Sequence, residues 1–278
     1  MRILLLGSRG RLGSSIKNFL VKKNVRFIEL NKKSLFSKQK NFETYLKLKN
    51  KNKIDLIINC TALTNVDLCN KNFNLAYKVN SQILDNIVTS IIHQKIQPLL
   101  VHFSTDQIYN SENYKKSNED SINLSNYYGM SKYLGELKVA QLKKHLIIRT
   151  NFFGKSYNKK KITYSDFLIK NLKKKSLKIP ANVFFNPILI DDLVEKTFVL
   201  IKKKIYGTFN IGSRTYMSKY NFASYLAKKK KLPIKNITSY KSIFKIHKRP
   251  LFTVMDISKF EKKTRIKLPT LLECLNRL

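Results

Sequence analysis

The sequence is poor in acidic residues, glycine and cysteine. Among 278 residues it has 17 Asp and Glu against 55 Lys and Arg, with eight glycines, three cysteines and no tryptophan. No apolar run approaches the ~20 residues of a membrane-spanning helix, and the apolar stretch at residues 3–6 is too short for a secretory signal. Cys60, Cys69 and Cys274 lack the spacing of zinc or redox sites. We therefore expect a cytoplasmic protein with reduced thiols, without membrane association and without a bound metal.

The shortage of acidic residues gives the chain a formal net charge of +38, a composition common among nucleic-acid-binding proteins. Here the lysines are scattered through every segment and form no single arm or aromatic-lined groove. Asn and Ile are abundant, which is typical of an AT-rich coding sequence. We interpret the charge as compositional drift and expect no nucleic-acid partner. The positive field still favours capture of anionic nucleotides.

Three of the eight glycines stand in one turn, at Gly7, Gly10 and Gly13. The apolar run at residues 3–6 predicts a buried strand before the turn, and helical spacing over residues 12–23 predicts a helix after it. A strand, a glycine turn and a helix N-terminus together favour an anion such as the pyrophosphate of a dinucleotide. The spacing G-x-x-G-x-x-G differs from the commoner G-x-G-x-x-G.

The end of the second predicted strand, residues 25–30, indicates which dinucleotide is preferred. Dinucleotide folds carry an acidic residue near this point, which holds the ribose 2′-hydroxyl and disfavours a 2′-phosphate. This chain has Asn31 there, followed by Lys32, and Arg9 and Arg11 lie in the glycine turn. The composition favours NADPH over NADH, although the lysine side chain can equally be solvated in so basic a chain.

Strands and helices are predicted to alternate through residues 1–150. The expected strands are 3–6, 25–30, 54–59, 98–103 and 145–149, and the expected helices are 12–23, one within 35–53, 75–92 and 127–142. This order predicts an α/β, Rossmann-type doubly wound parallel sheet that binds NAD(P). Residues 151–278 are expected to form mainly a smaller C-terminal substrate-binding lobe, with some segments (about 176–204) returning to the Rossmann sheet.

Within the second lobe the alternation is looser. We expect helices at 167–172, from Asp191–Asp192 to residue 200, at 220–231 and twice within 256–278, and strands at 177–179 and 207–212. The two aspartates are suited to cap their helix, because carboxylates satisfy the free N–H groups of a first turn.

Tyr128 and Lys132 lie four residues apart in a predicted helix and therefore share one face. A free tyrosine, with a pKa of ~10, is a poor acid–base catalyst at neutral pH. A lysine cation nearby favours the phenolate and lowers that pKa, so the pair predicts a general acid for a developing alkoxide. Thr105, at the end of the strand 98–103, is placed to donate a hydrogen bond to the same oxygen. Hydride addition to a carbonyl needs these groups and no metal.

Segments along nearly the whole chain match one known family, most strongly in the first 150 residues. Besides the glycine turn they are 59–67, Val79–Asn80, 101–106, 128–132, Gly135–Glu136, 148–150, 187–193 and Arg249–Pro250. On these residues the chain resembles the extended short-chain dehydrogenases/reductases and, within them, the dTDP-4-dehydrorhamnose reductase family. The resemblance implies that Tyr128 donates the proton, that Lys132 tunes the phenol and holds the nicotinamide ribose, and that Thr105 orients the keto oxygen.

Two groups of binding residues are expected. The cofactor-binding residues are Gly7, Arg9, Gly10, Arg11, Leu12, Gly13, Asn31, Lys32, Thr61, Ala62, Leu63, Asn80, Ser104, Tyr128 and Lys132. The substrate-binding residues are Thr105, Asp106, Asn151, Phe152, Pro187 and Arg249.

The resemblance implies an NAD(P)H-dependent reductase of a nucleotide-diphospho-4-keto-6-deoxy sugar, a monomer or homodimer that acts in surface-polysaccharide biosynthesis. The chain departs from the family in the substrate region. Where the family has Asp-Gln-x-Gly-x-Pro-Thr, residues 182–188 keep only the proline, and residues 149–154 lack the family's tryptophan. The hydride chemistry is therefore better supported than rhamnose as the sugar.

Other functions compete with this interpretation. An epimerase or dehydratase would keep the cofactor, but a dehydratase needs further carboxylates, and Thr105 is followed by Asp106 and Gln107 rather than by an Asp-Glu pair. A non-catalytic regulatory subunit is a third possibility, because the family includes one, and the intact Tyr128–Lys132 pair disfavours it. The four histidines are dispersed, and none is expected to be catalytic.

Overall fold

The computed structural model describes residues 1–30, 54–111, 113–155, 157–158, 162–244 and 249–278. Its centre is a six-stranded sheet in the order β10-β5-β4-β3-β1-β2, in which every pair of neighbours is parallel. The strands are β1 (Ile3–Leu6), β2 (Phe27–Leu30), β3 (Leu56–Asn59), β4 (Leu99–Phe103), β5 (His145–Thr150) and β10 (Gly207–Ile211). The doubly wound α/β fold expected from the sequence is confirmed.

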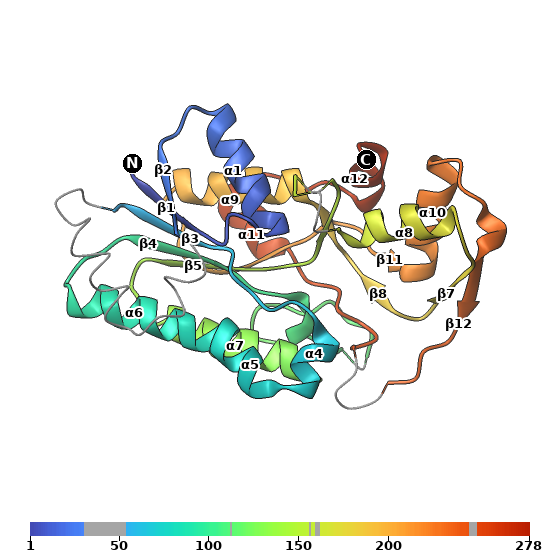
Figure 1. Cartoon of the computed structure of the whole chain (residues 1–278), viewed down its shortest axis with the longest axis horizontal. Helices are drawn as coiled ribbons and strands as arrows, with labels where there is room; N and C mark the ends of the chain where they lie inside the picture. The colour runs from blue at the N-terminus through green and yellow to red at the C-terminus, as the bar shows by residue number, and fades with distance from the viewer. Residues whose placement is uncertain (31–53, 112, 156, 159–161, 245–248) are drawn as a thin grey trace.

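Helices cover both faces of this sheet (Figure 1). One face carries α1 (Arg11–Lys22), α9 (Ile190–Lys202) and α11 (Ser258–Thr264). The other carries α4 (Val66–Lys71), α5 (Phe73–Tyr77), the π-helix η1 (Lys78–Gln82), α6 (Ile83–His93) and α7 (Tyr127–Val139). Neither the break between α4 and α5 nor the π-helical turn was predicted from the sequence. The helix expected within 35–53 lies outside the described residues.

Successive side chains of β1 point to opposite faces of the sheet, and both faces are buried, which explains why the strand is a continuous apolar run. Ile3 and Leu5 pack in the core that includes α1, whereas Leu4 and Leu6 pack in the core that includes α6. A strand buried on both faces needs an apolar side chain at every position. The helix α1 is fixed to α9 in part by stacking of Phe19 on Phe198, with ring centroids 4.6 Å apart.

The C-terminal lobe lies beside the carboxyl ends of the strands, at the right of Figure 1. It contains α8 (Tyr164–Leu172), α10 (Lys219–Lys229) and α12 (Leu271–Asn276), with the short strands β6 (Phe152–Phe153), β7 (Leu177–Pro180), β8 (Phe184–Phe185), β9 (Ile188–Leu189), β11 (Met217–Ser218) and β12 (Ile237–Tyr240). Two 3₁₀ turns complete the described elements, η2 (Asp106–Ile108) and η3 (Ile234–Asn236).

Two expectations about this lobe are corrected. The strand that returns to the central sheet is β10, beyond the expected range of about 176–204; within that range only α9 returns, as a covering helix, and β7, β8 and β9 form separate two-stranded sheets. The N-cap of α9 is Leu189, not the Asp191–Asp192 pair, which lies in the first turn instead. An apolar N-cap is tolerated here because two acidic side chains follow it near the positive end of the helix.

Buried charge fixes α7, the helix that carries the predicted catalytic pair, to the sheet. Arg149 of β5 and Glu136 of α7 are 5% and 3% exposed, with Nη2 2.6 Å from Oε2 and Nε 3.1 Å from Oε1. The guanidinium also donates to the hydroxyl of Tyr109 at 2.9 Å. A bidentate pair of this kind fixes orientation as well as position.

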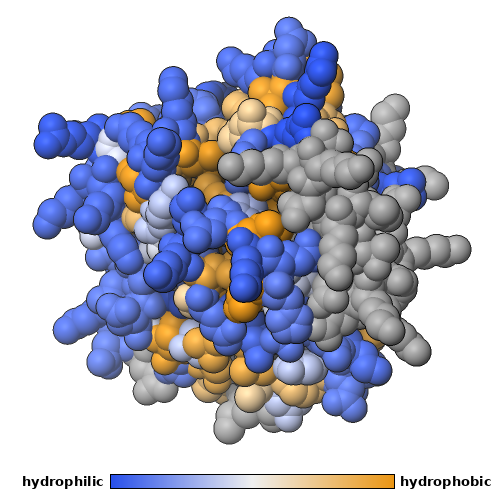
Figure 2. Space-filling model, turned by 90° about the vertical axis from the view of Figure 1, so that its left-hand side faces the viewer, coloured by the Kyte–Doolittle hydropathy of each residue, from blue (hydrophilic) through white to orange (hydrophobic). Residues whose placement is uncertain are grey.

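The surface matches the scattered lysines of the sequence. On the face shown in Figure 2, hydrophilic side chains dominate and the apolar ones form small groups between them. Within the described residues, no helix is both long and apolar enough to cross a membrane.

Replacing Arg149 with leucine is expected to destabilise the protein by about 3–5 kcal/mol, because Glu136 would remain buried without its partner. Replacing both residues with leucine should recover much of this loss, since no charge is then left buried. Urea unfolding of the single and double variants measures both effects. A single variant as stable as the wild type would show that the pair does not anchor α7.

Candidate active site

The glycine turn brings β1, α1 and the end of β3 into close contact. Gly7 has φ +76°, and a Cβ there would lie 2.8 Å from the carbonyl carbon of Cys60. A Cβ on Gly13 would lie 2.1 Å from the Gly7 carbonyl oxygen. Both positions therefore require glycine for the fold itself.

Gly10 differs from the other two glycines. It is the N-cap of α1 with φ −73°, a backbone angle that any residue adopts, and a Cβ there would meet only the Gly7 oxygen at 3.2 Å and the Cys60 oxygen at 3.9 Å. No side chain caps α1, and its first turn holds no acidic residue. The N–H groups of the turn are thus left for an anion, with positive partial charge behind them. This cradle fits a pyrophosphate.

The residues next to the glycines that are expected to bind the cofactor lie in different environments. Leu12 is buried in the core beneath the turn, and the carbonyl of Arg9 accepts a hydrogen bond from Asn158. Arg11 reaches into the second lobe, where its guanidinium donates to the Ile162 carbonyl at 2.9 Å and lies 5.9 Å from the Phe152 ring centroid. Asn31 and Lys32, on which the preference for NADPH rests, lie outside the described residues.

The loop after β3 is held against α7 by Asn80, a residue of the π-helical turn. The Asn80 side chain accepts from the Leu63 N–H at 2.8 Å and donates to the Leu63 carbonyl at 3.1 Å. It also donates to the Ser131 hydroxyl at 2.9 Å. Because both of its donors are used within the protein, Asn80 fixes the loop that carries Thr61 and the half-buried Ala62, two of the expected cofactor-binding residues.

Tyr128 and Thr105 meet at the carboxyl edge of the sheet. Asn126 caps α7 through the Gly129 N–H at 2.8 Å, and Tyr128 follows in the first turn, 8% exposed. Thr105 caps the 3₁₀ turn that follows β4, and its side chain lies near enough to the Tyr128 phenol to lower the pKa of that group. The preceding Ser104 has a buried hydroxyl with no partner among the described residues. The structure therefore brings the expected proton donor and its hydroxyl partner together.

The expectation that Lys132 lowers the pKa of Tyr128 is wrong. Burial raises the pKa of Tyr128 to about 12, and the largest opposing influence is the Thr105 side chain rather than Lys132. The Lys132 ammonium site points elsewhere, with Nζ 2.6 Å from the Phe103 carbonyl oxygen and 3.1 Å from His102 Nε2. Lys132 is 1% exposed, and burial lowers its pKa to about 8.

Asp106 organises the substrate side of the site. Its Oδ2 accepts from Asn151 at 2.7 Å and from Thr253 at 2.9 Å, and its Oδ1 from Gln107 at 3.3 Å. Burial raises the pKa of this carboxyl, while the same hydrogen bonds act in the opposite direction. Asp106 and Asn151 are thus brought together as expected, and Thr253 ties both to the second lobe.

The remaining substrate candidates lie in the second lobe in different settings. Phe152 is half-buried and Pro187 is buried. Arg249 is 49% exposed. Its Nη2 lies 3.6 Å from Oδ2 of Asp67, a residue of α4 in the Rossmann domain. Such an exposed pair is worth little energy and leaves the guanidinium available to a ligand.

Sequence reasoning missed Lys219, the first residue of α10. Its Nζ lies 5.7 Å from the ring centroid of Tyr164 and 5.9 Å from that of Phe185. Burial and the charge of Arg249 lower the pKa of Lys219 to about 8, while Asp106 acts in the opposite direction. Nothing in so lysine-rich a sequence distinguishes this lysine from the exposed ones.

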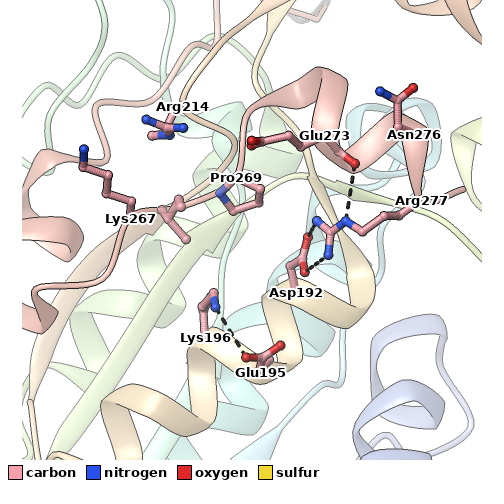
Figure 3. A pocket seen from close by; sticks show the side chains of 10 residues that line it. Asp192, Glu195, Lys196, Arg214, Lys267, Pro269, Glu273, Asn276 and Arg277 are labelled. Atoms are coloured by element: carbon pink, nitrogen blue, oxygen red, sulfur yellow. Dashed lines mark hydrogen bonds and ion pairs between the residues drawn. The ribbon is translucent and has the colours of Figure 1, made fainter.

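A hollow lies away from these residues, between α9 and α12. It has a volume of about 610 Å³ and mixed charge. Figure 3 shows Asp192 and Arg277 pointing toward one another there, with Nη1 2.7 Å from Oδ1. None of the expected site residues lines it. Across the described part of the chain, no group of three or more His, Cys, Asp or Glu residues could hold a metal ion.

Comparison with known proteins identifies the family of the chain. The family model described as the RmlD substrate binding domain matches residues 1–278. The chain belongs to this family. The resemblance found in the sequence is therefore confirmed.

The chain is similar to three known proteins. It is 26% identical to dTDP-4-dehydrorhamnose reductase of Aggregatibacter actinomycetemcomitans, over 94% of this chain and 92% of that one. It is 26% identical to the spore coat polysaccharide biosynthesis protein SpsK of Bacillus subtilis, over 80% and 77%. The structure of dTDP-4-dehydrorhamnose reductase (rfbD) of Bacillus anthracis in complex with NADP shares its fold, with a TM-score of 0.88, 22% identity and coverage of 99% and 97%.

The glycine turn predicts different outcomes for two substitutions. Gly10→Val should fold, because its φ suits valine, but should bind no NADPH, because the side chain fills the anion cradle. Gly13→Ala should lose at least the ~1–3 kcal/mol of an overpacked core, because its Cβ meets the Gly7 oxygen. Thermal unfolding and NADPH titration separate the two effects, and normal NADPH binding by a folded Gly10→Val variant would contradict the assignment.

Proposed function

We propose that this chain is an NAD(P)H-dependent reductase of a nucleotide-diphospho-4-keto-6-deoxy sugar. The observation that carries the proposal is that Thr105 and Tyr128 meet at the carboxyl edge of the sheet, where doubly wound folds bind ligands, with Lys132 buried one turn further along α7. Membership of the RmlD family and the names of its relatives support the same activity.

The residues present fit a nicotinamide dinucleotide. The uncapped N-terminus of α1 and the open side of Gly10 would hold its pyrophosphate, and the unpartnered hydroxyl of Ser104 and the amine of Lys132 would contact its other end. The bound cofactor supplies the hydride. We propose NADPH over NADH, because Arg9 and Arg11 add positive charge to the turn; the Bacillus anthracis relative was solved with NADP.

The chain's own residues supply the proton. With a pKa of about 12, the Tyr128 phenol keeps its proton at neutral pH and can give it to the oxygen of a reduced carbonyl. The Thr105 hydroxyl donates to Asp106 Oδ1 at 3.4 Å in the free protein and would turn to donate to the same oxygen when the substrate is bound. Burial of all three side chains keeps bulk water from competing for that oxygen.

The second lobe would hold the nucleotide sugar. We propose that residues 151–278 form mainly this substrate-binding lobe, with Asn151, Phe152, Pro187 and Arg249 as contacts. Lys219 lies close enough to Arg249 for the two positive charges to act on one another, and a pair of cations suits a diphosphate. We further propose a role in polysaccharide biosynthesis, as the name of the SpsK relative suggests, in the cytoplasm.

A panel of nucleotide-diphospho sugars tests this function. Purified protein is incubated with NADPH or NADH and each 4-keto-6-deoxy sugar or its 4-hydroxy counterpart, and the loss of nicotinamide absorbance is followed. We expect cofactor oxidation with keto sugars only, and faster with NADPH. Faster reaction with NADH would contradict the cofactor preference, and no oxidation with any keto sugar would contradict the reductase.

Tyr128→Phe is expected to lower the rate of single-turnover hydride transfer by roughly 10²–10⁴-fold, because it removes the proton donor and keeps the ring. NADPH affinity should be largely unchanged, since the phenol acts in the transition state. Tyr133→Phe, on the same helix but away from Thr105, is the matched control and should react like the wild type. Equal rates for both variants would remove Tyr128 from the mechanism.

A further inference from the structure

A line of buried polar groups runs behind the catalytic pair, from the loop after β3 to α7. Asn59, His102 and Lys132 are each no more than 1% exposed. Asn59 and His102 are directly paired neighbours in β3 and β4, and α7 covers one face of the sheet that contains these strands (Figure 1). Because water does not reach these side chains, each donor must find an acceptor among its neighbours.

The orientation of the Asn59 amide is fixed at one end of this line. Its Oδ1 lies 3.0 Å from the backbone nitrogen of Thr61. A backbone N–H only donates, so the oxygen of Asn59 must face Thr61 and its NH₂ group must face His102. The Asn59 Nδ2 lies 3.1 Å from His102 Nδ1, and because an amide NH₂ also only donates, Nδ1 must be the acceptor nitrogen of the ring.

The proton of a neutral His102 ring therefore sits on Nε2, which faces Lys132 Nζ at 3.1 Å. An Nε2–H group can donate only to a nitrogen that carries a lone pair, which an ammonium lacks. Lys132 in turn donates to the Phe103 carbonyl at 2.6 Å. The donors then run in one direction from Thr61 to Phe103, and no N–H faces another N–H.

We propose that His102 is a positioning residue that donates from Nε2 to Lys132 and so stabilises the neutral amine of Lys132 in the free protein. The proposal rests on the proposed function, in which Lys132 contacts the cofactor and Tyr128 must keep its proton. The Tyr128 phenol, whose pKa is raised by burial, keeps its proton in this state, as the proposed function requires.

The other titratable groups near Lys132 do not prevent His102 from stabilising its neutral amine. Glu136 favours the ammonium from one turn along α7, but its carboxylate is engaged by Arg149. Cys60, after β3, is a neutral thiol, because burial raises its pKa. Burial lowers the pKa of Lys132 to about 8, so at pH 7 its two protonation states differ only about tenfold in population. One hydrogen bond is enough to shift that balance.

Replacing His102 with phenylalanine tests the direction of the hydrogen bond, because the ring is kept and both nitrogens are lost. Lysines labelled at Cε are titrated by NMR in the free protein, and the Lys132 signal is assigned by its loss in Lys132→Met. If His102 donates, its removal deprives the neutral amine of a donor and raises the pKa of Lys132 by about 0.5–1 unit. A fall in the pKa would overturn the proposal, because it would mean that His102 accepts from an ammonium.

A second measurement needs no substitution at His102. The ¹⁵N shifts of the His102 ring in the wild type report which nitrogen carries the proton. A protonated Nε2 and a bare Nδ1 are expected, and the reverse would overturn the proposal. Both readouts use protein without cofactor or substrate, so they distinguish failure of this proposal from failure of the proposed reductase, which the keto-sugar panel tests.

Discussion

The burial of polar groups on one face of α7 is the constraint on which the site depends. Tyr128, Lys132 and Glu136 recur every four residues on this helix and all point into the protein. Such a helix is stable only if each of them finds a partner, and the sheet supplies Thr105, the Phe103 carbonyl and Arg149. The catalytic geometry is therefore part of the packing of the fold.

The same constraint explains why chemistry gathers at the carboxyl edge. Parallel strands leave their last residues at one edge, where β1 delivers the glycine turn and β4 delivers Thr105 and Asp106. Asp106 then connects this edge to the second lobe through Asn151 and Thr253. This buried carboxylate accepts from both parts of the site and so fixes their relative position.

Much of the fold and part of the site could be predicted from the sequence. Double-sided burial makes β1, β3 and β4 visible as apolar runs, and the glycine spacing and the Tyr128–Lys132 pair mark the edge where they end. Partners formed between distant segments left no pattern. Lys132 was expected to tune Tyr128, yet it bonds to His102 and Phe103, because β4 passes beneath α7. Lys219 could not be singled out, because its burial depends on the packing of α10.

The central claim is hydride transfer to a sugar carbonyl, and the fate of a deuterium label tests it most directly. The protein is incubated with NADPH deuterated at the transferable position of the nicotinamide and with the nucleotide-diphospho-4-keto sugar that it turns over. Mass spectrometry and NMR of the product should find one deuterium, on the former keto carbon. Product without deuterium, or deuterium on another carbon, would contradict the account, because the carbonyl would not then be the hydride acceptor.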